Sequence, residues 1–153
     1  MLRISKLTDY GTVVLASLVG TRHKVVSAAE IAGHTRISLP TVSKLLKSLA
    51  RAGLVESMRG ANGGYRLSRD PQRISAADII EALEGPVSIT ECLSNDSHCD
   101  YEQQCSPCSA WRSVNNAIRI ALSEVSLMEL AKDASRPQVM EFGGMPITVE
   151  RTV

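Results

Sequence analysis

Apolar residues recur at helical spacing in the N-terminal part of this 153-residue chain. Residues 5–19 carry the first such pattern, which predicts a helix. Ser27 and Glu30 have the spacing of a capping box in front of a second, short helix. Ser38 stands where an N-cap is expected, and Pro40 suits the first turn that follows. The third helix would bury one apolar row: Val42, Leu45, Leu46 and Leu49.

The pattern then changes from helical spacing to two short strand-like runs. Residues 54–58 and 65–68 flank a glycine-rich turn at 60–64, which is a hairpin signal. A fourth helix is predicted over residues 75–83. A helix pair followed by a hairpin is typical of a winged helix-turn-helix. The predicted fold is therefore mainly α with a small β-hairpin wing, and residues 1–85 form this DNA-binding domain.

The C-terminal part divides into three predicted segments. Residues 86–108, called the cysteine segment below, are small and polar. Residues 109–134 predict one long helix with a coiled-coil-like apolar seam, which packs either on the chain's own winged domain or on another helix: Trp111, Val114, Ile118, Ala121, Val125 and Met128. Residues 135–153 contain several Pro and Gly and predict a disordered tail.

The charge distribution favours a polyanionic partner for the first half of the chain. The whole chain carries a net charge of only +1. Residues 1–70 hold 11 Lys and Arg against 4 Asp and Glu, a net +7, whereas residues 71–153 carry −6. A chance split of charges is the alternative, but a basic half joined to an acidic half is typical of nucleic-acid binding. The apolar runs are too short for a transmembrane helix.

Candidate DNA contacts follow from the predicted fold. The third helix would enter the major groove with its first turn, and the wing would lie on the backbone or in the minor groove. Hydroxyl groups could bond bases or phosphates, and lysines could neutralise phosphates or reach guanine. An ordinary solvated helix face is the alternative. The candidates on the helix and on the wing are Ser38, Pro40, Thr41, Ser43, Lys44, Lys47, Arg59, Asn62, Gly63 and Arg66.

Four cysteines lie within 17 residues and nowhere else in the chain: Cys92, Cys99, Cys105 and Cys108. Their polar surroundings cannot order this segment by packing, so a metal or disulfides must do so. No secretory signal is recognisable, which predicts a cytoplasmic protein and favours metal binding or redox chemistry over structural disulfides. Only the last pair fits the short spacing of zinc sites, and the wider gaps favour a larger iron–sulfur cluster. Zinc and redox thiols remain alternatives.

The sequence resembles the bacterial family of iron–sulfur-dependent winged-helix repressors, which includes cluster-biogenesis, nitric-oxide and iron-responsive regulators. The resemblance covers residues 1–134 and is carried by the stretches LRISKLTDYG, ISLPTVSKLLKSLARAGLVES, RGANGGYRL and ISAADIIEAL, and by the spaced cysteines before a Trp-containing helix. Within that family the chain is most similar to regulators of the SUF iron–sulfur assembly operon. The resemblance implies a homodimer built on the helix over residues 109–134, double-stranded operator DNA as the partner, and no enzymatic activity.

The same resemblance implies a set of cluster ligands. Three are Cys92, Cys99 and Cys105, and the cluster is expected to be 2Fe–2S, with 4Fe–4S as the alternative. The fourth ligand differs among members of the family. Cys108 occupies a place held by histidine in some members, and Asp9 matches an acidic residue that the partner subunit donates in others. The sequence thus predicts a repressor that senses cluster status; a zinc-stabilised regulator and a thiol redox sensor are the alternatives.

Overall fold

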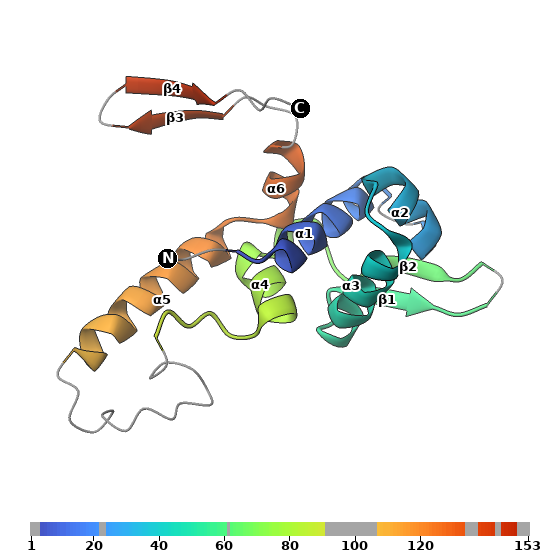
Figure 1. Ribbon diagram of the computed structural model, residues 1–153, viewed down its shortest axis with the longest axis horizontal. Coiled ribbons are helices and arrows are strands. Elements are labelled where there is room, and N and C mark those ends of the chain that lie inside the picture. The colour runs from blue at the N-terminus through green and yellow to red at the C-terminus, as the bar shows by residue number, and fades with distance from the viewer. Residues whose placement is uncertain are drawn as a thin grey trace.

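The computed structural model describes residues 4–21, 24–60, 62–90 and 107–133, and the backbone of residues 138–142 and 145–149. Helices and strands follow one another in the order that the sequence predicts for a winged helix-turn-helix (Figure 1). The elements of this part are α1 (Lys6–Val19), α2 (Ala28–Thr35), α3 (Leu39–Arg51), β1 (Val55–Met58), β2 (Gly64–Leu67), the 3-10 turn η1 (Pro71–Arg73) and α4 (Ala76–Glu84). Two further helices, α5 (Cys108–Glu124) and α6 (Leu127–Asp133), complete the described helices.

The core is aliphatic, as a chain with 3% aromatic residues requires. It joins α1, α2, α3, the start of β1, α4 and α6, and its fully buried members include Leu15, Leu18, Ile31, Leu45, Leu46, Leu49, Ile74, Ile79 and Leu127. The hairpin is antiparallel, with Val55 opposite Leu67 and Met58 opposite Gly64. Val26 pairs with Tyr65, so the backbone before α2 is bonded to the wing. The wing is therefore attached to the helix pair on both sides.

The capping box predicted at Ser27 is confirmed, and a second capping box starts α4. The Ser27 hydroxyl accepts from the Glu30 N–H while the Glu30 carboxylate accepts from the Ser27 N–H. Ser75 and Asp78 do the same at the start of α4. Ser38 is different: it precedes α3 but makes no side-chain cap, and its hydroxyl lies 2.8 Å from the Thr41 hydroxyl. This pairing leaves the first turn of α3 without a capping side chain.

The structure has two helices where the sequence predicts one helix over residues 109–134. The helix ends at Glu124, and Val125 is extended at φ −88° and ψ 115°. The Val125 carbonyl accepts from the Ala76 N–H, and the Leu127 N–H donates to the Ile74 carbonyl. Ser126 then caps α6 together with Glu129. The break therefore arises from backbone pairing with a distant segment, which buries Leu127 completely in the core.

The C-terminal segment also differs from the prediction of disorder. Strands β3 (Gln138–Phe142) and β4 (Met145–Val149) form a separate antiparallel hairpin, with Gln138 opposite Val149. Two short apolar runs separated by two glycines are a hairpin pattern. In the structure this pattern outweighs the Pro and Gly content on which the disorder prediction rests.

Candidate nucleic-acid interface and cysteine segment

The outer face of α3 is basic and open to solvent. Helix α3 buries its apolar row in the core, which leaves Lys44 and Lys47 exposed on the other side. The sequence has no acidic residue between Glu30 and Glu56. The turn before α3 places Arg36 at φ 56°, a left-handed backbone that is uncommon outside glycine and costs about 1 kcal/mol or more. The helix pair therefore presents cations in the place where a helix-turn-helix meets phosphates.

Two of the three predicted hydroxyl contacts are less exposed than the lysines. Thr41 and Ser43 are both half-buried, and the Thr41 hydroxyl is paired with Ser38. Leu39 and Pro40, in contrast, are both exposed at the start of the helix. The first turn of α3 thus exposes apolar carbon atoms beside two hydroxyl groups that are hydrogen-bonded to each other.

The wing carries the remaining DNA candidates. Arg59 and Asn62 are exposed beside the turn, and Gly60 has φ 111°, which favours glycine. A Cβ on Gly63 would lie 2.5 Å from the Met58 carbonyl oxygen, so only glycine fits there. Arg66 is paired with a neighbour: its guanidinium lies 2.8 Å from the Glu56 carboxylate. To contact DNA as predicted, Arg66 must therefore leave Glu56 or bind Glu56 and a DNA group at the same time.

Three of the candidate ligands, Cys92, Cys99 and Cys105, lie outside the described residues. Cys108 is the first residue of α5 and is buried, with 8% of its surface exposed. Asp9 is exposed in the first turn of α1. Among the residues that the structure describes, no three His, Cys, Asp or Glu side chains are grouped to hold a metal ion. The structure consequently brings no ligand set together within its described part.

Asn115 fixes the path of the chain just before these cysteines. Its side chain is buried, with 7% exposed, and it lies on α5. The Ile89 N–H donates to Asn115 Oδ1 at 3.2 Å, and Asn115 Nδ2 donates to the Val87 carbonyl at 3.1 Å. Cys108 precedes Asn115 by two helical turns and so shares its face of α5.

The cysteine segment therefore starts and ends at one face of one helix. The start of the segment is bonded to Asn115, and Cys108, at its other end, begins the same helix two turns earlier. Four thiolates form a donor set that suits an iron–sulfur cluster or zinc. Of these four thiols, the structure describes only that of Cys108. Sequence reasoning missed Asn115, although a polar residue in phase with Ile118 and Leu122 was a possible signal.

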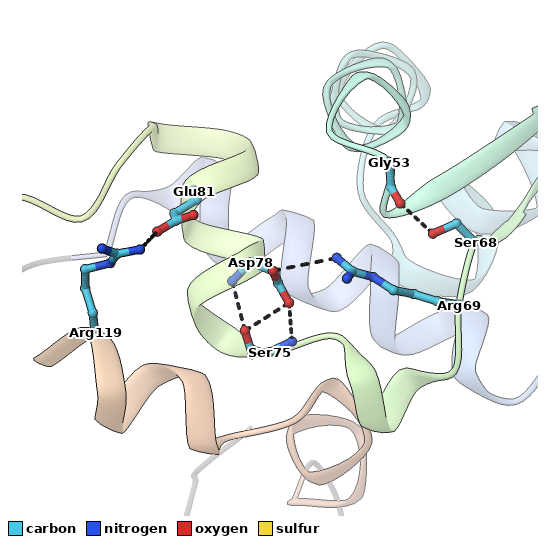
Figure 2. Close-up of polar contacts among 7 residues, drawn as sticks. All are labelled: Gly53, Ser68, Arg69, Ser75, Asp78, Glu81 and Arg119. Atoms are coloured by element: carbon cyan, nitrogen blue, oxygen red, sulfur yellow. Dashed lines mark hydrogen bonds and ion pairs between the residues drawn. The ribbon is translucent and has the colours of Figure 1, made fainter. Parts of the chain in front are cut away.

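A series of polar contacts joins α5 to the wing through α4 (Figure 2). Arg119 on α5 lies 3.2 Å from the Glu81 carboxylate on α4. At the other end of α4, Asp78 of the capping box lies 3.6 Å from Arg69, just after β2. The adjacent Ser68 hydroxyl donates to the Gly53 carbonyl, at the end of α3. Side-chain contacts through α4 thus connect helix α5 to the segment that follows the wing.

The comparison with known families decides the identity of the chain. Residues 4–133 match the profile of Rrf2, described as an iron-dependent transcriptional regulator. The chain belongs to the Rrf2 family. This confirms the resemblance to cluster-dependent winged-helix regulators and the fold class that it implied. The protein is accordingly a transcriptional regulator of this family.

Relatives named IscR and CymR match this chain about equally well. The HTH-type transcriptional regulator IscR of Xenorhabdus nematophila is 34% identical over 132 residues, which cover 84% of this chain and 80% of the relative. CymR of Bacillus subtilis is 33% identical over 131 residues, covering 85% and 90%. Among solved structures, B. subtilis CymR, described as the global cysteine regulator, has a TM-score of 0.67 at 33% identity over 86% of this chain and 98% of that one. The structure of T. potens IscR has a TM-score of 0.64 at 32% identity, over 92% and 94%.

These relatives are transcriptional regulators, which agrees with the prediction that the chain is not an enzyme. Among the helices that the structure describes, none is long and apolar enough to cross a membrane.

Proposed function

We propose that this Rrf2 protein is a homodimeric, cytoplasmic repressor that senses iron–sulfur cluster status and controls genes of cluster assembly. One observation carries the proposal: a segment with four cysteines is held at both ends on α5, and α5 is connected to a winged helix-turn-helix. IscR relatives in several organisms support the cluster as the signal.

The proposed ligands are Cys92, Cys99 and Cys105, with Cys108 or the partner subunit's acidic residue Asp9 as the fourth. A 2Fe–2S cluster is favoured, and its presence or loss supplies the change in charge and coordination that the regulator reads. Among the described residues, Asn115 holds the start of the cysteine segment against α5, and Cys108, at the end of the segment, begins that helix. A change in this segment therefore acts directly on α5.

The dimer is proposed to form through the outer face of α5. This helix extends away from the body formed by α1–α3 (Figure 1). Trp111 and Val114 are one helical turn apart and are 46% and 43% exposed, which is unusual for side chains of this size. A second copy packed there would relate two recognition helices by a two-fold axis, as palindromic operators require. The contacts through Glu81 and Asp78 then give α5 a route to the wing.

The decisive experiment combines spectroscopy with DNA binding. Protein purified without oxygen, or reconstituted with iron and sulfide, should be brown and absorb in the visible. Its affinity for its own promoter fragment should differ between cluster-loaded and cluster-free forms, because a ligand shifts an equilibrium only by binding two states unequally. A colourless protein that holds zinc, or equal DNA affinity with and without a cluster, would refute the proposal.

Substitution of single cysteines tests the ligand set. Cys92→Ala, Cys99→Ala and Cys105→Ala should each abolish visible absorbance while circular dichroism remains that of the wild type, because the winged core is formed by other residues. A variant that keeps the full cluster shows that its cysteine is not a ligand. Unfolding of all three variants would mean that the metal has a structural role instead.

The fourth ligand needs a paired comparison. Cys108→Ser and Asp9→Ala are measured side by side for absorbance and for the rate of cluster loss. We favour Cys108, because thiolate is the commoner cluster ligand and this residue ends the cysteine segment. Loss of the cluster in Asp9→Ala but not in Cys108→Ser would reverse the assignment.

A thiol-based regulator without a cluster is the second candidate. The CymR relatives favour it, because they match this chain about as well as the IscR relatives do, and one Staphylococcus aureus structure is described as an oxidized form of CymR. Titration with an oxidant and a reductant separates the two candidates. DNA affinity that follows thiol oxidation in cluster-free protein supports the thiol regulator.

A further inference from the structure

Leu39 is an apolar side chain in an unexpected place. It is the first residue of α3 and is 46% exposed, whereas Leu45, Leu46 and Leu49 of the same helix are at most 1% exposed. Nothing in the core requires a leucine at this position. In a helix-turn-helix, the first turn of this helix is the part that reaches base edges.

The polar groups near Leu39 are poorly placed to read bases themselves. The Ser38 and Thr41 hydroxyls are 2.8 Å apart and bond to each other. Ser43 is half-buried, and Pro40 has no N–H to donate. Lys44 and Lys47 lie further along the helix, where they suit phosphates. The first turn therefore exposes the carbon atoms of Leu39 and Pro40 beside a hydroxyl pair that is already hydrogen-bonded.

We propose that Leu39 is a specificity-determining residue that reads a thymine through its 5-methyl group. The thymine methyl is the apolar feature of the major-groove edge, and only A·T and T·A pairs present it. Removing one methyl-sized group from water contributes about fourfold in affinity. The inference rests on the proposed DNA-binding function and adds the chemistry of one base contact to it.

The test removes only the methyl group. A cognate duplex is first selected by the wild-type protein from a pool of random DNA duplexes. Each thymine is then replaced singly by deoxyuridine, and binding is measured by fluorescence anisotropy. At one thymine per half-site, deoxyuridine should weaken wild-type binding about fourfold, and about 15-fold when both half-sites are changed. Leu39→Ala should bind the thymine and deoxyuridine duplexes equally, and Leu39→Met should regain part of the discrimination.

Lys47→Ala is the matched control on the same helix. It should bind both duplexes more weakly but keep the wild-type ratio between them, because a phosphate contact carries no base information. Circular dichroism and sedimentation of Leu39→Ala should match the wild type, since the side chain is exposed.

Three results would overturn the assignment. One is a wild-type protein that is insensitive to deoxyuridine at every position. Another is a Leu39→Ala variant that retains the sensitivity, which would assign the methyl contact to another residue. The third is a change of oligomeric state in Leu39→Ala, which would assign Leu39 to a subunit contact. Failure to select any specific duplex refutes the proposed function itself and removes the Leu39 inference with it.

Discussion

Asn115 offers the sharpest test of how the cysteine segment is held. In Asn115→Ala the helix keeps its backbone and loses both side-chain bonds, one from the Ile89 N–H and one to the Val87 carbonyl. A hydrogen bond contributes about 0.5–1.5 kcal/mol net, so the pair is worth about 1–3 kcal/mol. Val87 and Ile89 are half-buried, and partial access of water keeps the loss within this range.

The neighbouring Asn116 supplies a matched control. It is exposed on the same helix, so Asn116→Ala removes the same chemical group without either contact and should change stability by less than about 0.5 kcal/mol. Free energies of unfolding come from urea titrations at a fixed protein concentration. Hydrogen exchange gives a local readout: the Ile89 amide should exchange faster in Asn115→Ala only. Equal stability of the two variants, with unchanged exchange at Ile89, would refute the reasoning.

Four further predictions follow from the described contacts. Leu127→Ala should lower the free energy of unfolding by about 2–5 kcal/mol in urea titrations, because this side chain is fully buried in the core that α1–α4 form. Hydrogen bonding from Thr8 lowers the pKa of Glu84, so its contribution is present above the unfolded pKa and is lost as pH falls through the folded one; the stability difference between wild type and Glu84→Gln should shrink from about pH 5 to pH 3, and a pH-independent difference would contradict this. Lys47→Ala should weaken binding to cognate and random DNA alike and reduce the salt slope by about one, whereas a loss confined to cognate DNA would mean base readout. Val114→Glu should convert a dimer to a monomer in sedimentation experiments, since this side chain is 43% exposed on the proposed interface; a persistent dimer would exclude that face.

The sequence predicted those parts of the fold that depend on neighbouring residues. The capping boxes at Ser27 and Ser75 follow from bonds that span three residues, and the inward row of α3 follows from helical spacing alone. The break after α5 did not follow, because it depends on bonds from Val125 and Leu127 to the segment before α4, far away in the sequence. Apolar spacing continues through the break and so conceals it.

The sequence predicted which types of residue form the candidate site better than it predicted their contacts. The exposure of the Lys44 and Lys47 side chains followed from the amphipathic spacing of the helix. The pairing of Ser38 with Thr41 and of Arg66 with Glu56 did not, because each depends on which of several available partners lies nearest in space. The same is true of Asn115, whose partners are single backbone atoms that any residue could supply.

The burial of Leu127 has a consequence for how the protein is made. Synthesis starts at the N-terminus, so α1–α4 leave the ribosome while the core that they share with α6 is still incomplete. The whole cysteine segment emerges before the residue that closes this core. Newly made chains therefore pass through a stage in which all four thiols are present and the DNA-binding domain lacks its last buried side chain. Delivery of the proposed cluster and completion of the fold can then compete or cooperate in time, because Leu127 follows the cysteine segment in the sequence.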